Sequence, residues 1–223
     1  MLAIIQARMS SSRLPGKMMM KLADRPILSW VYDRVCQAAN VDKVLVATSI
    51  TSSDDPIEAY CSSRSMPIFR GSLEDVAGRF LAAVENEHAP AFIRINGDSP
   101  LIDPQIIDIG INQFKSEEYD LVTNVQQRTF PKGQSVEIIS TNAFKRLCDK
   151  QSLQADREHV TKLFYANNFE FKVKNFSSNP NMSDIQLSVD TMEDFQRVEK
   201  IINLSGGLPG GWRELVALEK ACR

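Results

Sequence analysis

The chain has 223 residues, of which 43% are hydrophobic and 24% are charged, and its formal net charge is −2. This amount of apolar material is enough for one substantial core, so we expect one folded domain. The near-neutral charge gives no bulk attraction to nucleic acid or to an anionic membrane, and we expect neither as a partner. An anionic ligand would therefore be bound by a local cluster of basic side chains.

The cysteines and the N-terminal segment bear on where the protein works. The four cysteines are widely spaced and form no C-x-x-C pair, which argues against a zinc knuckle or a disulfide framework. The apolar run in the opening sequence MLAIIQARM is too short for a secretory signal and has no basic segment before it. No stretch approaches the roughly 18 apolar residues of a membrane-spanning helix. We therefore expect a cytoplasmic protein.

Apolar, β-branched runs alternate with segments of helical period in the first half of the chain. The expected strands are residues 2–6, 43–48, 67–69, 91–95 and 119–123, and the expected helices are residues 26–39, 56–63, 73–87 and 104–115. Asp55-Pro56 and Asp103-Pro104 each place a capping carboxylate before a proline at the first helical position. This alternation predicts an α/β, Rossmann-like fold of three layers, with a mainly parallel sheet covered on both faces.

The second half of the chain is less regular. We expect a loop over residues 126–134, strands at 135–140, 169–176 and 185–189, and helices at 142–149 and 156–167. Asp190-Thr191 opens a further helix, in which Thr191 and Asp194 have the spacing of a capping box. Residues 204–223 read as a glycine-rich linker followed by a C-terminal helix at 214–222.

The loop after the first expected strand has the composition of an anion-binding site. In parallel α/β sheets, ligands bind outside the carboxyl ends of the strands, so the residues that follow each strand carry the most information. Arg8, Arg13 and Lys17 supply positive charge, three serines supply hydroxyl groups, and Gly16 allows backbone N–H groups to approach an anion. The loop suits a triphosphate, although it is neither a G-x-G-x-x-G nor a Walker A motif. The alternative is an ordinary solvated loop.

Two aspartates follow other strands and are candidates for a metal site. Asp98 lies in a sharp Gly-Asp-Ser-Pro turn, and Asp190 follows the last expected strand. Two carboxylates together with phosphate oxygens and water are how Mg²⁺ is usually held. The alternative is that each is a turn or cap aspartate, since Thr191 already caps the next helix.

Two polar segments of the second half are candidates for binding a substrate. Arg157-Glu158-His159 at an expected helix start suits an acidic or polyhydroxyl compound, but a capped helix N-terminus has the same composition. The segment 128–133 is either a substrate lid or a mobile turn.

The residues 6–17, with the sequence QARMSSSRLPGK, resemble the signature loop of the CMP-sugar synthetases for sialic acid and Kdo. The closer resemblance is to the cytidylyltransferases of the spore-coat-polysaccharide type. It extends in order over about residues 1–203 and takes in the segments 69–76, 94–102, 128–131, 136–137, 157–161 and 189–191.

The resemblance implies a Rossmann-like nucleotidyltransferase fold, with one nucleotidyltransferase domain over residues 1–223. It implies that Arg13, Lys17 and Asp98 are catalytic, and that Asp98 and Asp190 bind Mg²⁺. The implied nucleotide-binding residues are Ala7, Arg8, Ser11, Arg13, Lys17, Arg70, Asp75, Arg79, Asn96 and Gly97. The implied acceptor-binding residues are Phe130, Glu137, Arg157 and His159. Residues 125–165 are a possible substrate or dimerisation subdomain of a homodimer.

One departure from the family pattern concerns the acceptor. Related proteins often carry a Gly-Leu-Asp-Val-Glu-like run where this chain has Gly133-Gln134-Ser135-Val136-Glu137, so the acidic residue expected at Ser135 is missing. The identity of the acceptor stays open.

The activity implied is transfer of CMP from CTP to an acidic sugar, nonulosonic or Kdo-like, with release of pyrophosphate, in surface polysaccharide biosynthesis. One alternative is a nucleotide-sugar-dependent glycosyltransferase, although the usual D-x-D motif is absent. Another is a non-catalytic nucleotide-binding scaffold, which would have no need of the two aspartates.

Overall fold

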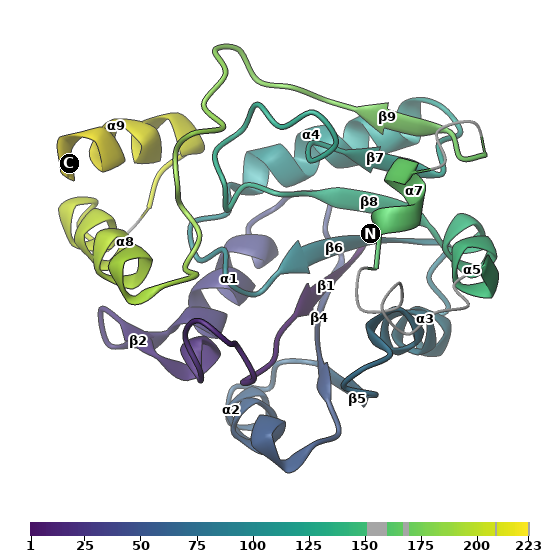
Figure 1. Ribbon diagram of the computed structural model, residues 1–223, viewed down its shortest axis with the longest axis horizontal. Coiled ribbons are helices and arrows are strands. Elements are labelled where there is room, and N and C mark those ends of the chain that lie inside the picture. The colour runs from purple at the N-terminus through teal and green to yellow at the C-terminus, as the bar shows by residue number, and fades with distance from the viewer. Residues whose placement is uncertain (151–159, 167–169, 208, 223) are drawn as a thin grey trace.

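The computed structural model describes residues 1–150, 160–166, 170–207 and 209–222. In this part of the chain a seven-stranded sheet forms the centre of the molecule (Figure 1). Its strands are β1 (Leu2–Gln6), β4 (Lys43–Ser49), β5 (Ile68–Gly71), β6 (Ala91–Asn96), β7 (Leu121–Thr123), β8 (Glu137–Ser140) and β9 (Val173–Asn175). They lie in the order β5-β4-β1-β6-β8-β7-β9. A separate two-stranded hairpin joins β2 (Lys21–Leu22) to β3 (Arg25–Pro26).

The sheet is mainly parallel, as the sequence predicts. Strand β1 lies between β4 and β6 and is parallel to both, so that Leu2 pairs with Lys43 on one side and Phe92 on the other. Strand β5 extends the parallel set beyond β4. The exception is β8, which is antiparallel to both of its neighbours, β6 and β7.

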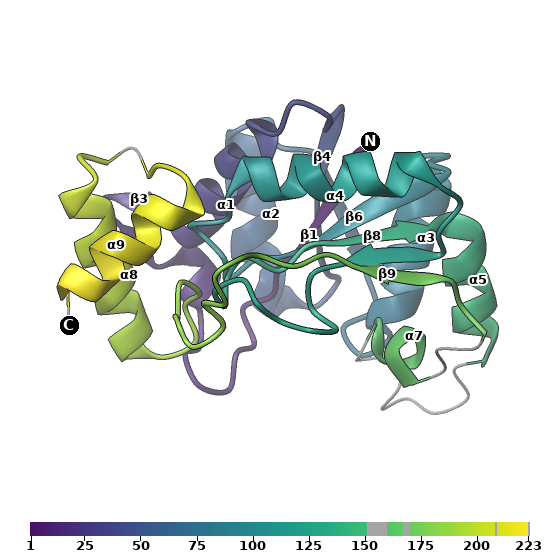
Figure 2. The same cartoon turned by 90° about the horizontal axis from the view of Figure 1, so that it is seen from above.

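Helices cover both faces of the sheet, which gives the three predicted layers (Figure 2). One face carries α1 (Ile27–Cys36), α2 (Asp55–Ser63), α4 (Pro104–Ser116), α8 (Met192–Leu204) and α9 (Trp212–Cys222), and the other carries α3 (Val76–Asn86), α5 (Thr141–Lys150) and α7 (Lys162–Ala166). Alternate residues of β1 serve the two cores, because successive side chains of a strand point to opposite faces. Ala3 and Ile5 pack into the first core, and Leu2 and Ile4 into the second.

Most of the expected elements are present within a few residues of their predicted bounds, but two expectations are wrong. Residues 185–189 form no strand. Within this segment Gln186 forms one isolated parallel β-bridge with Lys132. Ile185, Leu187 and Val189 are buried, so the alternation that suggested a strand comes from packing against the core. The second error is the cap of α2, which is Asp54, while Asp55 accepts a hydrogen bond from Arg70.

The expected helix at 156–167 lies partly outside the described residues, and its described part contains α7. The predicted capping box of α8 is confirmed, since the side chains and backbone groups of Thr191 and Asp194 pair reciprocally. Helices α4 and α8 have 13 residues each. In the described ranges no helix has both the length and the apolar composition needed to cross a bilayer.

Buried polar contacts fasten the C-terminal segment to helix α1 and to the start of helix α4. Arg34 donates hydrogen bonds to the carbonyls of Ile102, Pro209 and Gly210, at 2.8, 2.7 and 2.9 Å. Asp103 caps α4 by accepting from the N–H of Gln105 at 2.9 Å, and its other oxygen accepts from the N–H of Trp212 at 2.8 Å. These contacts position α9 beside α8 (Figure 1).

We expect Asp103→Ala to lower the free energy of unfolding by about 2–4 kcal/mol, because it removes a helix cap and leaves the buried Trp212 N–H unpaired. Urea denaturation monitored by circular dichroism measures the change. Asp184, an exposed turn residue, provides the control, since Asp184→Ala should cost less than about 0.5 kcal/mol. Similar losses in the two variants would show that Asp103 does not fasten the segment.

Candidate active site

The loop after β1 and the turn after β6 enclose a pocket at the carboxyl edge of the sheet. Its volume is about 230 Å³. Its lining residues are Gln6, Arg8, Ser11, Ser12, Arg13, Lys17, Met18, Asn96, Gly97, Asp98 and Asp190. The site predicted from the strand ends is therefore brought together in space, from three distant parts of the chain.

The loop is held in shape by its own backbone and by one buried carboxylate. The carbonyl of Met9 accepts hydrogen bonds from the N–H groups of Ser11 and Gly16, both at 2.9 Å, and Gly16 has the left-handed φ of 74° that favours glycine. The N–H of Met9 donates to Asp54 at 2.7 Å. Asp54 is fully buried and also accepts from the N–H and hydroxyl of Ser49, at 3.1 and 2.5 Å. The loop is thus tied to the end of β4.

Lys17 is the centre of the site. Its ammonium lies 2.9 Å from a carboxylate oxygen of Asp98 and 3.3 Å from one of Asp190, and it donates to the carbonyl of Val189 at 2.8 Å. A terminal nitrogen of Arg13 lies 2.8 Å from the same oxygen of Asp190. The side chain of Lys17 is only 10% exposed, so these partners offset the cost of burying its charge.

The two aspartates fit the requirements of a divalent cation. Both face the same pocket, and each is partly exposed. The Lys17 ammonium demonstrates that one positive charge can be stabilised by both carboxylates at once. Among the described residues no group of three or more His, Cys, Asp or Glu side chains is gathered for a metal. Two protein carboxylates match Mg²⁺, which commonly takes its other ligands from phosphate oxygens and water.

Close packing explains the glycine beside Asp98. A methyl group added to Gly97 would lie 2.6 Å from the carbonyl oxygen of Gln6 and 2.9 Å from the sulfur of Met18. The N–H of Gly97 also donates to the carbonyl of Gln6 at 2.9 Å. The turn that carries Asp98 therefore rests directly on the end of β1.

Ala7 follows Gln6, the last residue of β1. It is buried and donates its N–H to the carbonyl of Ala47 at 3.1 Å.

Arg70 and Asp75 make structural contacts beside the pocket. The Arg70 guanidinium donates to the carbonyls of Ser49 and Thr51, at 2.8 and 3.0 Å, and pairs with Asp55 and Glu58. Asp75 caps α3 by accepting from the N–H of Gly78 at 2.7 Å. Neither residue lines the pocket that holds Lys17.

Arg79 is a different case, because its guanidinium is buried and incompletely paired. It is 2% exposed and donates from one nitrogen to the carbonyl of Ser72 at 2.5 Å. Its Nε and other terminal nitrogen have no hydrogen-bond partner among the described residues. Burial lowers the pKa of Arg79, Asp54 opposes this shift, and Arg8 of the loop adds to it. Arg79 therefore does not line the pocket but lies within electrostatic range of Arg8, which does.

Two of the four expected acceptor residues are described by the structure, and neither of them lines the pocket. Phe130 is buried in the core, where its ring meets those of Phe176 and Trp212 edge to face. Glu137 is 3% exposed and pairs with Arg94 and the hydroxyl of Tyr165. Arg157 and His159 lie outside the described residues. The sequence did not distinguish these roles for Phe130, because an aromatic residue in a polar loop can either bind a ligand or pack into the core.

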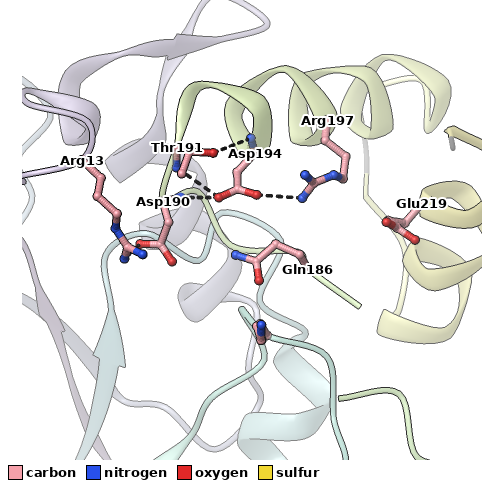
Figure 3. Close-up of a pocket in the computed structure, with 8 residues that line it drawn as sticks. Arg13, Gln186, Asp190, Thr191, Asp194, Arg197 and Glu219 are labelled. Carbon is pink, nitrogen blue, oxygen red and sulfur yellow. Dashed lines mark hydrogen bonds and ion pairs between the residues drawn. The ribbon is translucent and has the colours of Figure 1, made fainter. Parts of the chain in front are cut away.

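A second pocket, of about 550 Å³, adjoins the first through Arg13 and Asp190 (Figure 3). Its other lining residues are Lys132, Gln186, Thr191, Asp194, Arg197 and Glu219. Figure 3 shows Asp194 between Thr191 and Arg197, to which it is bonded. Lys132 belongs to the segment 128–133 that was a candidate substrate lid, whereas Gln186, Arg197 and Glu219 were not anticipated, because no local motif marks them.

The fold and the site define an α/β protein of the nucleotidyltransferase class: a mainly parallel sheet, a basic loop after its first strand and two aspartates at the same edge. The sequence model of the family described as Cytidylyltransferase matches residues 2–215. The chain belongs to this cytidylyltransferase family.

Known proteins agree with this assignment. The chain is 32% identical over 218 residues to the spore coat polysaccharide biosynthesis protein SpsF of Bacillus subtilis, covering 93% of this chain and 88% of that one. It is 26% identical to the 3-deoxy-manno-octulosonate cytidylyltransferase of Thermodesulfovibrio yellowstonii, covering 93% and 89%. The structure superposes on that of a cytidylyltransferase from Leptospira borgpetersenii with a TM-score of 0.93, 30% identity and coverage of 98% and 93%.

We expect Gly97→Ala to lower the free energy of unfolding by about 1–3 kcal/mol, because the backbone of β1 must shift to admit the methyl group. The same shift displaces Asp98, so affinity for CTP, measured by calorimetric titration, should fall. Gly206→Ala is the control: nothing lies within 4 Å, but its φ of +66° makes the substitution cost about 1–2 kcal/mol. Equal CTP affinities in the two variants would contradict the role given to Gly97.

Proposed function

We propose that this protein transfers CMP from CTP to an acidic sugar with release of pyrophosphate, and that the reaction depends on Mg²⁺. The observation that carries the proposal is the placement of Lys17 between Asp98 and Asp190, at the mouth of the basic loop. This arrangement supplies positive charge for phosphates and carboxylates for a cation in one pocket. Membership of the cytidylyltransferase family favours CTP as the donor over the nucleotide sugar that a glycosyltransferase would require.

The reaction is an in-line displacement at phosphorus. A hydroxyl oxygen of the acceptor forms a bond to the α-phosphorus of CTP, the hydroxyl proton is released, and the bond from the α-phosphorus to the bridging oxygen breaks. The electron pair of that bond leaves with pyrophosphate. Positioning and electrostatic stabilisation supply most of the rate enhancement in such chemistry.

The residues of the pocket divide this work. Arg8, Ser11, Arg13 and Lys17 would bind the triphosphate, and Arg13 and Lys17 would stabilise the departing pyrophosphate. Asp98 and Asp190 would hold Mg²⁺, which neutralises charge on phosphate oxygens when bound. Asn96 and Gly97 would position the nucleotide. Arg79 would extend the nucleotide site beyond the loop, since two donors of its buried guanidinium have no hydrogen-bond partner in the part of the chain that the structure describes.

The substrate class and setting follow from the relatives. One is named for a coat polysaccharide and another for 3-deoxy-manno-octulosonate. We therefore propose a nonulosonic or Kdo-like acceptor and a role in surface polysaccharide biosynthesis. We also propose that the protein works in the cytoplasm as a homodimer.

Pyrophosphate release tests the reaction. The protein is incubated with Mg²⁺, each of the four nucleoside triphosphates and a panel of acidic sugars. We expect release with CTP and one class of acid, and none when EDTA replaces Mg²⁺. CTP binding without release across the panel would favour the non-catalytic scaffold, and release with another triphosphate would refute the choice of CTP.

Asp98→Asn tests the role of the carboxylate pair. We expect pyrophosphate release to fall by at least about 100-fold, the effect typical of losing a group that stabilises transition-state charge. The circular dichroism spectrum should not change, because Asp190 and Val189 still pair with Lys17. Asp184→Asn, an exposed aspartate in a turn, is the matched control and should retain full activity. An Asp98→Asn variant with undiminished turnover would refute the metal role.

A further inference from the structure

A row of polar side chains crosses the sheet on the face that carries α7. Arg94 of β6 is paired in register with Glu137 of β8, and Glu137 with Thr123 of β7. Directly paired residues point to the same face of a sheet, so the three side chains are neighbours. Their strand neighbours on this face, Phe92 and Ile139, belong to the core under α3, α5 and α7.

This row continues into the active-site pocket. Arg94 donates to the side-chain oxygen of Gln6 at 3.0 Å, and Gln6 lines the pocket that holds Asp98 and Lys17. On its other side Arg94 pairs with Glu137, which also accepts from the hydroxyl of Tyr165. Burying charged groups on a sheet face costs free energy, and apolar residues could fill the same positions. The presence of charged residues here, beside the pocket, therefore indicates a functional role.

Arg128 brings a second guanidinium to this row. It donates to the hydroxyl of Ser135 at 3.0 Å. Burial lowers the pKa of Arg128, while the nearby charge of Glu137 opposes this shift. Its loop is rigidly placed, because the buried side chain of Gln134 accepts from the N–H of Asp103 at 2.8 Å and donates to the carbonyl of Leu101 at 2.7 Å. Arg128 therefore projects from a loop fixed to the segment that follows Asp98.

The charges of this cluster do not balance within the described residues. The carboxylate of Glu137 forms an ion pair with Arg94, and Arg128 lies within electrostatic range of the same carboxylate. Arg94 Nε and one terminal nitrogen of Arg128 are buried without a hydrogen-bond partner in the described ranges. A carboxylate would supply the missing negative charge, and each of its two oxygens can accept a charge-assisted hydrogen bond from one of the two arginines.

We propose that Arg94 and Arg128 bind the carboxylate of the acceptor, and that the neutral residue at Ser135 leaves the charge of Arg128 available for it. The inference rests on the proposed function and adds the residues that select an acidic acceptor. An aspartate at position 135 would instead pair with Arg128 and compete with the substrate.

Ser135→Asp tests this directly, with Ser135→Asn as a control of the same size and no charge. The full-length protein, saturated with CTP in EDTA so that turnover is suppressed, is titrated calorimetrically with 3-deoxy-manno-octulosonate and with N-acetylneuraminate. We expect at least one acid to bind the unsubstituted protein, and to bind the Asp variant about tenfold more weakly than the Asn variant. The methyl ester of that acid should bind more weakly and should not distinguish the two variants.

The remaining outcomes separate this inference from the proposed function. Equal affinities of the acid for the Asp and Asn variants, equal binding of acid and ester, or no binding of either acid to a protein that binds CTP would overturn the inference. Failure to bind CTP in the presence of Mg²⁺ would overturn the proposed function itself. A purely structural role for Arg128 predicts a changed melting temperature in Ser135→Asp and no preference for acid over ester. Arg128→Gln, which removes the charge while keeping donors, should weaken acid binding and leave CTP affinity intact.

Discussion

The arrangement of the site depends on the buried ammonium of Lys17. It joins the loop after β1 to the turn after β6 and to the segment before α8. Its partners Asp98 and Val189 lie 81 and 172 positions after Lys17 in the sequence. An ammonium so little exposed is tolerated only where partners replace its water, so the three segments must come together for Lys17 to be buried. The same contacts define the pocket, and its geometry is therefore fixed by the fold before any ligand binds.

The loop after β1 has a second anchor at its other end. Lys17 holds its C-terminal part, while the buried carboxylate of Asp54 holds the N–H of Met9 and ties it to Ser49 of β4. Between these anchors the loop keeps Arg8, Ser11 and Arg13 around the pocket. Preorganised charge of this kind stabilises a transition state without further rearrangement.

Much of this architecture was predictable from local patterns. Strand and helix periodicity identified the α/β sheet, and the rule that ligands bind at carboxyl strand ends led to Lys17 and Asp98. The same rule led to Asp190 only through the strand wrongly predicted at residues 185–189. Asp54 was missed because the Asp-Pro pattern favours Asp55 as the cap. Residues 185–189 were misassigned because alternating burial also arises where an extended segment lies against a core. The pairing of Arg94 with Glu137 depends on the antiparallel placement of β8, which local sequence does not encode.

The antiparallel strand β8 brings a second polar connection to the edge of the sheet that carries Lys17 and Asp98. In a purely parallel sheet, the only connections that start at the carboxyl edge are those that leave the ends of strands. Because β8 runs against β6 and β7, its first residue, Glu137, lies beside Arg94 near the carboxyl end of β6. The whole connection from β7 to β8, with Arg128, Gln134 and Ser135, is thereby placed at the same edge. One reversed strand thus adds a second polar loop at the edge of the sheet that carries Lys17 and Asp98, and this loop is separate in sequence from the loop after β1.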